Sequence, residues 1–264
     1  AIEILKKESI FVMEDLRAST QDIRPLKILI LNLMPLKIST ETDLLRLLSN
    51  SPLQIEIEFL GLSTHTPKNT PIEHLMSFYT NFSSIKNRYF DGMIITGAPV
   101  EMLEFEEVNY WSEMTQICDW ARTHVTSTFY ICWAAQAALY HFYGIKKYPL
   151  DKKLFGVFKH KVNDPSFPLF RGFDDEYYAP HSRHTTLKAE EIKQHNDLTI
   201  LSESDEAGVY IATSRGGREF YVTGHSEYSP LTLHNEYIRD KEKGMDNVAP
   251  PLNYYKNNDP TQPP

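Results

Sequence analysis

Apolar and polar positions in the first half of the chain alternate in blocks that predict strands separated by helices. Residues 26–34 (LKILILNLM) are almost continuously apolar, which is typical of a central parallel strand covered on both faces. Residues 53–59 (LQIEIEF) alternate strictly, which indicates a half-exposed strand nearer the edge of a sheet. Residues 90–96 and 125–132 predict two further strands.

The segments between these strands carry helix signals. Thr40, with Asp43 three residues later, is predicted to cap a helix. The core stripe of that helix is expected to be Leu44, Leu45, Leu47 and Leu48. Further helices are predicted after Thr70-Pro71, over 108–122, and over 134–139 with Gly144 as the stop. Strands that alternate with helices favour an α/β fold with a doubly wound, mostly parallel sheet, whose chemistry gathers at the carboxyl ends of the strands.

The second half is less regular. Short strands are predicted over 156–162, 198–202, 209–213 and 220–223, and a helix from Pro230 to about Lys243. We find no internal repeat or interdomain linker, so we expect one catalytic domain over residues 1–264. Within it, residues 1–23 are expected to form an N-terminal arm. Residues 253–264 are expected to form a proline-rich tail without a core of its own.

Composition narrows the classes of protein that fit. The 264 residues are 41% apolar, with a formal charge of −8, so no nucleic-acid footprint is indicated. No apolar run is as long as a membrane span, and no signal peptide precedes the first strand. Two cysteines are too few for a disulfide scaffold or a cysteine-rich zinc site. We therefore expect a cytoplasmic protein with free thiols.

Cys132 stands where a predicted strand turns into a predicted helix. A thiol there lies near a helix N-terminus, where unpaired N–H groups and the dipole favour the thiolate. Such a turn also presents the sulfur to a cleft and leaves N–H groups for a developing oxyanion. The plainer interpretation is a small buried hydrophobe. That interpretation fits Cys118, which lies on the apolar stripe of a predicted helix.

A cysteine nucleophile needs a base, and the base needs a partner that fixes its tautomer. His225 and Glu227 follow the end of a predicted strand and Gly224, and a turn there would bring the carboxylate to the imidazole. His181 and His184 lack cysteines or carboxylates at ligand spacing, so no metal site is predicted. The chain carries no glycine-rich phosphate loop of the Rossmann or Walker type, and no cofactor is predicted.

Across most of residues 8–264 the chain resembles the homoserine O-acyltransferases of the trans-succinylase and transacetylase family. The matching segments are 24–35 (RPLKILILNLMP), 48–54 (LSNSPLQ), 90–92 (FDG), 96–99 (TGAP), 132–134 (CWA), 171–175 (RGFDD), 179–183 (APHSR) and 222–225 (VTGH). Family members generally continue beyond a segment like 257–260, so the tail is expected to be shortened. The resemblance implies a fold like that of class I glutamine amidotransferases (flavodoxin-like) and a possible homodimer.

The resemblance also implies residue roles. Cys132 matches the acyl-thioester cysteine, His225 the general base, and Glu227 the carboxylate behind it. Three further matches concern substrate contacts: Lys153, Ser182, and Arg239, whose guanidinium would pair with the amino-acid carboxylate. The implied reaction is ping-pong acyl transfer from acyl-CoA to the γ-hydroxyl of L-homoserine. The backbone N–H groups of Trp133 and of the 97–100 turn, including Val100, are the expected oxyanion donors.

The acyl donor is predicted from Glu101. Succinyl-using members that resemble this chain carry glycine at this position, and acetyl-using members carry glutamate. A glutamate carboxylate would repel the distal carboxylate of a succinyl group, so we expect acetyl-CoA and the product O-acetyl-L-homoserine, for methionine synthesis. The nearest alternative is homoserine O-succinyltransferase.

Two alternatives belong to other classes. One is a glutaminase-like hydrolase or amidotransferase with the same triad, although residues 130–134 depart from the Gly-x-Cys-x-Gly of glutaminases. The other is a binding module in which Cys132 belongs to the core.

Overall fold

A computed structural model describes residues 2–7, 24–64, 70–244 and 248–264 of the chain. These residues form two compact units, Ala1–Tyr130 and Ile131–Pro264. Most of the predicted N-terminal arm, residues 8–23, lies outside the described residues. Within the described part of the chain, no helix combines the length and apolar character that crossing a membrane requires.

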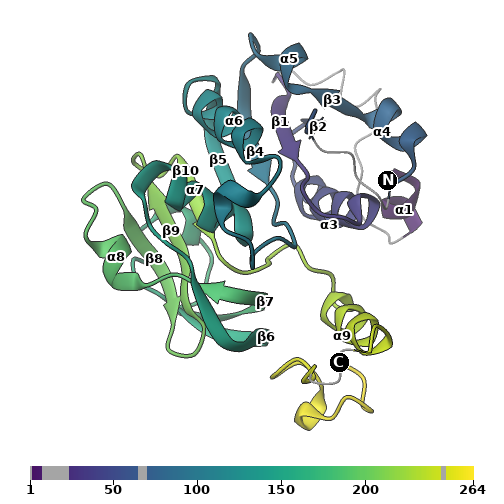
Figure 1. Ribbon diagram of the computed structural model, residues 1–264, viewed down its shortest axis with the longest axis vertical. Coiled ribbons are helices and arrows are strands. Elements are labelled where there is room, and N and C mark those ends of the chain that lie inside the picture. Colours follow the sequence, from purple (N-terminus) through teal and green to yellow (C-terminus); the bar gives the residue numbers. More distant parts are fainter. Residues whose placement is uncertain (1, 8–23, 65–69, 245–247) are drawn as a thin grey trace. The chain divides into compact units, whose positions relative to one another are not determined.

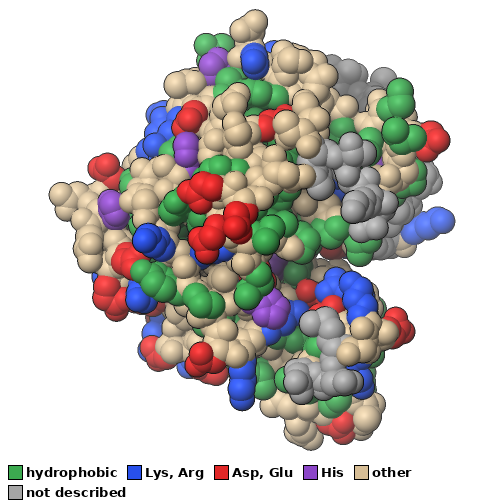
Figure 2. Space-filling view, in the orientation of Figure 1, with side chains coloured by type: hydrophobic (Ala, Val, Ile, Leu, Met, Phe, Trp, Pro, Cys, Tyr) green, Lys and Arg blue, Asp and Glu red, His purple; other side chains and the backbone are tan. Residues whose placement is uncertain are grey.

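Charged side chains of both signs are interspersed over the face of the molecule that Figure 2 shows, with apolar side chains between them. On that face the described residues form no broad basic surface of the kind that attracts nucleic acid. The mixture agrees with the modest negative charge of the sequence.

The first unit is built on parallel strands in the order β3-β2-β1-β4-β5 (Figure 1). The strands are β1 (Leu26–Leu31), β2 (Ile55–Gly61), β3 (Tyr79–Asn81), β4 (Phe90–Ile95) and β5 (Val125–Ile131). The helices are α1 (Ile2–Lys7), α3 (Lys37–Ser49), α4 (Ile72–Phe78), α5 (Phe82–Ile85) and α6 (Trp111–His124), with a 3₁₀ turn over Phe105–Glu107. The predicted central strand is confirmed, because β1 pairs with both β2 and β4 and its last three residues are fully buried. The strand predicted near an edge is confirmed as β2, whose outer neighbour is the three-residue β3.

Helix α3 differs from its prediction. It begins at Lys37, three residues before Thr40, and Leu36 at its N-cap makes no side-chain capping bond. The predicted apolar stripe is partly wrong, because Leu47 is 50% exposed. The helix instead buries Lys37, Thr40, Glu41 and Leu44, which follow helical spacing but are mostly polar.

The polar face of α3 forms a buried cluster after the end of β1. The Lys37 ammonium donates to the carbonyl of Asn32. The Glu41 carboxylate accepts from Tyr79 Oη at 2.5 Å and lies 2.9 Å from His74 Nε2. Burial lowers the pKa of Lys37 to about 8, and Glu41 opposes the shift only in part. The buried side chains of this face are mostly polar and are held by hydrogen bonds, so the face leaves no hydrophobic pattern in the sequence.

Replacing Lys37 by methionine is expected to stabilise the protein at neutral pH. The pKa of Lys37 in the folded protein lies below the value of about 10.4 for an unfolded lysine. Burial of the charged ammonium therefore lowers the free energy of unfolding by its full amount below pH 8, and this loss fades as pH rises toward 10. After the lost hydrogen bond is subtracted, a gain of roughly 2 kcal/mol is expected at pH 7. Urea unfolding between pH 7 and 10 measures it. Lys27→Met on the exposed part of β1 is the matched control, and a Lys37→Met gain that does not shrink with pH would contradict the prediction.

The second unit contains an antiparallel sheet in the order β10-β9-β8-β6-β7 (Figure 1). Its strands are β6 (Tyr148–Val162), β7 (Glu176–Thr186), β8 (Thr199–Ser204), β9 (Gly208–Ser214) and β10 (Glu219–Val222). Its helices are α7 (Trp133–Tyr143), α8 (Ala189–Lys193) and α9 (Thr232–Glu242), with 3₁₀ turns over Pro168–Phe170 and Lys256–Asn258. Gly144 ends α7 in the left-handed conformation, as predicted.

Strand β7 was not predicted from the sequence, although it is 11 residues long. Its inward positions are Ala179, His181, Arg183 and Thr185. Because three of these four side chains are polar, the strand shows no apolar alternation. Ser182 lies between two inward residues, so its side chain points to the opposite face of β7.

The last residues of the chain attach to strand β6 through what we call the C-terminal strap, residues 252–255. Leu252 exchanges backbone hydrogen bonds with its neighbours, its N–H donating to the carbonyl of Phe155 and its carbonyl accepting from Val157, both at 2.9 Å. The approach requires glycine at position 156, where a Cβ would lie 2.3 Å from the Leu252 carbonyl oxygen. Tyr255, within the predicted tail, is 4% exposed and joins a hydrophobic cluster with Phe155, whereas most residues over 256–264 are exposed.

Candidate active site

Cys132 lies on a strained turn between β5 and α7. Its φ of 51° and ψ of −114° fall in a region that non-glycine residues rarely adopt, which costs roughly 1–3 kcal/mol. Its N–H donates to the carbonyl of Val222, at the end of β10, at 2.7 Å, and its carbonyl accepts from Ala135 of α7 at 3.1 Å. These two bonds hold the strained backbone. The residue is 7% exposed.

His225 and Glu227 follow β10 and meet as the sequence predicts. Nδ1 of His225 lies 2.7 Å from Oε1 of Glu227, and both side chains are buried. The His225 N–H donates to the carbonyl of Pro180 in β7 at 2.9 Å. Gly224 permits this approach, because a Cβ there would lie 2.8 Å from the same carbonyl. Since Nδ1 is engaged by Glu227, the hydrogen bond that His225 shares with Cys132 falls to Nε2.

The electrostatics of the site favour a protonated imidazole. Burial by itself lowers the pKa of His225, but the Glu227 carboxylate and then the negative charge and hydrogen bond of Cys132 outweigh it, and the pKa is raised well above its usual value. A thiolate–imidazolium pair is the state that such a shift supports. Oε2 of Glu227 is buried and has no hydrogen-bond partner among the described residues. Among the described residues, the hydrogen bond of the Glu227 carboxylate is therefore the one to Nδ1 of His225.

The three residues expected to bind substrate lie in one charged cluster. Ser182 Oγ donates to Glu236 Oε1 at 3.0 Å. Nζ of Lys153 lies 3.3 Å from Asp240 Oδ2 and 3.7 Å from Glu236 Oε1. Arg239 directs both Nε and Nη2 to Oδ1 of Asp240, at 2.9 and 2.7 Å. Two cations and two carboxylates thus face one another, and Ser182 joins them through Glu236.

Glu236 and Asp240 were missed by the sequence reasoning. Both lie on α9 at helical spacing with Arg239, and in a sequence they look like solvated helix charges. Their burial distinguishes them: Asp240 is 7% exposed, and Glu236 Oε2 is a buried oxygen without a hydrogen-bond partner among the described residues. A buried oxygen without a partner is costly, so this one is a candidate acceptor for a ligand donor. The only signal in the sequence was the i, i+3, i+4 spacing of the three charges.

The remaining expected site residues lie at two turns. Trp133 is the first residue of α7. The backbone N–H groups of a first helical turn point toward the helix N-terminus, the end that favours negative charge. Val100 and Glu101 follow β4 in the first unit, on a turn closed by the Leu103 N–H donating to the Val100 carbonyl at 3.1 Å. Both side chains are partly exposed. The turn follows the carboxyl end of its strand, which is the end at which α/β sheets bind ligands.

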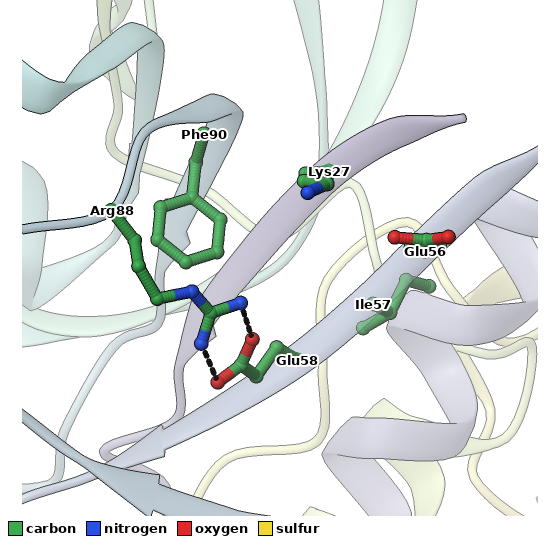
Figure 3. A pocket seen from close by; sticks show the side chains of 6 residues that line it. All are labelled: Lys27, Glu56, Ile57, Glu58, Arg88 and Phe90. Carbon is green, nitrogen blue, oxygen red and sulfur yellow. Dashed lines mark hydrogen bonds and ion pairs between the residues drawn. The ribbon is translucent and has the colours of Figure 1, made fainter. Parts of the chain in front are cut away.

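A hollow in the first unit lies at the opposite ends of the strands. Its volume is about 210 Å³, below the roughly 300 Å³ of a small ligand pocket. Figure 3 shows Arg88 and Glu58 joined across it by two hydrogen bonds, of 2.8 and 2.6 Å. Lys27 and Phe90 stand at the amino ends of β1 and β4, away from the ends where chemistry is expected. We therefore assign it no catalytic role.

A family model described as homoserine O-succinyltransferase matches residues 1–264. The chain belongs to this family. Relatives named homoserine O-acetyltransferase align with the entire chain: one from Bacteroides fragilis is 66% identical over 264 residues and one from Parabacteroides distasonis is 64% identical. The alignment spans 86% and 85% of those proteins. One from Brevibacillus brevis is 60% identical over 264 residues and is spanned to 86%.

Solved structures confirm the predicted fold class. A glutamine amidotransferase from Thermotoga maritima superposes with a TM-score of 0.60 at 13% identity, over 86% of this chain and 87% of that one. A glutamine amidotransferase from Methylobacillus flagellatus gives a TM-score of 0.54 at 10% identity, over 92% of this chain and 82% of that one. The homoserine acyltransferase chain thus has a class I glutamine amidotransferase-like α/β fold. The hydrophobic pattern did not predict that strands β6 to β10 pair in antiparallel fashion.

Proposed function

We propose that this chain transfers an acetyl group from acetyl-CoA to the γ-hydroxyl of L-homoserine, giving O-acetyl-L-homoserine for methionine synthesis. The observation that carries the proposal is that relatives named homoserine O-acetyltransferase match all 264 residues at 64–66% identity. The contacts of Cys132, His225 and Glu227 supply a chemistry suited to that transfer.

In the first half-reaction, the Cys132 thiolate attacks the thioester carbonyl of acetyl-CoA. The carbonyl oxygen gains negative charge, which the N–H of Trp133 at the start of α7 and that of Val100 are proposed to stabilise. The tetrahedral intermediate collapses as the bond to the CoA sulfur breaks, and the imidazolium of His225 returns its proton to that sulfur. CoA leaves, and the acetyl group remains on Cys132 as a thioester.

In the second half-reaction, neutral His225 takes the proton of the homoserine hydroxyl while its oxygen attacks the acetyl thioester. Glu227, 2.7 Å from Nδ1, stabilises the imidazolium that forms. The new ester is released, and the Cys132 thiolate and His225 imidazolium are restored. The chain's own side chains supply the nucleophile and the base, and acetyl-CoA is a co-substrate.

The charged cluster on α9 fits an amino-acid substrate. Free homoserine carries an ammonium and a carboxylate, and the cluster offers carboxylates from Glu236 and Asp240 and cations from Lys153 and Arg239. We propose that the partnerless Oε2 of Glu236 accepts from the substrate ammonium. Arg239 Nη1, which makes no hydrogen bond to the described residues, is proposed to donate to the substrate carboxylate.

Glu236→Gln is expected to weaken homoserine binding without affecting the first half-reaction. Losing one charge-assisted hydrogen bond costs roughly 1.5–3 kcal/mol, so kcat/KM for homoserine should fall about 10- to 100-fold. Steady-state kinetics and mass spectrometry of the acetyl adduct measure the two effects separately. Glu242→Gln, at the exposed end of the same helix, is the control. Equal losses in both half-reactions would contradict a role in homoserine binding.

The function is tested by mixing the protein with homoserine and either acetyl-CoA or succinyl-CoA and following free CoA. We expect CoA and O-acetyl-L-homoserine from the acetyl donor. Release of ammonia from glutamine, without any need for a CoA thioester, would replace the proposal by an amidotransferase-like hydrolase. Inertness toward every donor, with slow thiol labelling of Cys132, would point to a binding module.

A further inference from the structure

Tyr228 lies flat against the imidazole of His225. The two ring centroids are 4.2 Å apart and the ring planes differ by 15°. Tyr228 follows His225 by three residues, and its N–H donates to the His225 carbonyl at 3.4 Å, so the short turn that carries Glu227 also folds the phenol back over the imidazole. The stacking is therefore built into the turn.

The Tyr228 side chain is also held by a hydrophobic cluster in the second unit. This cluster contains Phe155 of β6, Leu233 and Tyr237 of α9, and Tyr255 of the C-terminal strap, and Tyr228 packs against it. Tyr255 is tied to α9 by its hydroxyl, 2.8 Å from Nδ1 of His234. The ring thus has a fixed support and cannot swing away from His225 without leaving the cluster.

The phenol also faces the charges of the site. Burial, followed by the negative charges of Glu236, Glu227 and Cys132, raises the pKa of Tyr228 well above its usual value, and Arg239 opposes this only in part. The side chain therefore stays a neutral phenol at physiological pH. A neutral ring can stack on an imidazolium without altering the net charge of the triad.

We propose that Tyr228 is a positioning residue for His225, whose ring keeps the imidazole turned toward Cys132 and stabilises its protonated form. The inference rests on His225 being the base of the proposed transfer. Glu227 and Cys132 each engage one ring nitrogen of the imidazole, and the flat face of Tyr228 further opposes rotation of the ring. When the imidazole takes a proton, the electron-rich face of the phenol attracts the positive charge.

The test compares rings of similar size and different electron density at position 228. Tyr228→Phe should retain nearly full kcat, and Tyr228→Leu should lower kcat roughly tenfold with little change in the KM for homoserine. The midpoint of the His225 titration, followed by NMR of labelled histidine, should fall by about 0.5–1 pH unit in Tyr228→Leu and remain unchanged in Tyr228→Phe. Pentafluorophenylalanine at position 228 should lower the midpoint as leucine does, although its shape is that of phenylalanine.

Tyr89→Leu is the matched control, since Tyr89 stacks on His124 at 4.9 Å and 23° outside the triad. It should change neither kcat nor the His225 midpoint. The proposal is overturned if Tyr228→Phe behaves like Tyr228→Leu. It is also overturned if the pentafluorophenylalanine variant has the same His225 midpoint as Tyr228→Phe. The NMR titration needs no substrate, so it remains decisive even if the wild type fails to release CoA from acetyl-CoA.

Discussion

Cys132→Ala is expected to abolish acetyl transfer. The variant lacks the atom on which the acetyl group is held, so turnover should fall by a factor on the order of 10⁴ or more, as it does when a covalent nucleophile is removed from other enzymes. Free CoA released from acetyl-CoA in the presence of homoserine measures the loss. Intact-mass spectrometry of the wild type mixed with acetyl-CoA alone should show one acetyl group, on the peptide that contains Cys132.

The second cysteine is the natural control. Cys118 is 1% exposed on the apolar face of α6, so Cys118→Ala should keep the activity and lose only some stability. An acetyl adduct on Cys118, or transfer at near wild-type rate by Cys132→Ala, would contradict the covalent mechanism.

Glu101→Gly is expected to admit succinyl-CoA as a donor. The family resemblance implies that the Glu101 carboxylate lies beside the acyl group. Two like charges about 4 Å apart repel by about 1 kcal/mol in water and about 4 kcal/mol at an effective dielectric of 20. The variant should therefore gain roughly fivefold to several-hundredfold in kcat/KM for succinyl-CoA, because about 1.4 kcal/mol is tenfold in rate.

Glu101→Gln separates charge from size. It keeps the length of the side chain and removes the repulsion, so it should recover the electrostatic part of the gain and leave any steric part in place. Competition between acetyl-CoA and succinyl-CoA in one reaction gives the ratio of kcat/KM values directly. A wild type that already prefers succinyl-CoA would refute both the repulsion argument and the donor assignment.

Elements that bury apolar side chains were predictable, whereas α3 and β7, which bury mainly polar side chains, were not predicted correctly. Strand β1 and helix α7 were found because their buried side chains are apolar. Helix α3 was given the wrong start because it buries Lys37 and Glu41, and β7 was missed because His181 and Arg183 point inward. Hydrophobic periodicity detects burial of apolar surface only.

The residues of the candidate site also differ in how far the sequence around them indicates their role. Cys132 and the His225–Glu227 pair stand at strand ends, so their chemistry was visible in short segments. Glu236 acquires its significance from Ser182, far away in the chain. Tyr228 stacks on the nearby His225, but its support comes from a cluster that includes the distant Phe155. No pattern along the sequence encodes such a meeting, because helix charges and aromatic residues are common everywhere.

The C-terminal strap also sets an order of events in time. Asn253 donates to the carbonyl of Val157 at 3.2 Å, across 96 positions of sequence. Contacts of such separation form late and slow the folding of a chain, because the intervening loop must close first. A ribosome releases residues 132 and 225 before residues 252–255. A newborn chain would therefore hold its nucleophile and base before it holds the cluster that supports Tyr228, and full activity should appear only after the last residues of the strap have emerged.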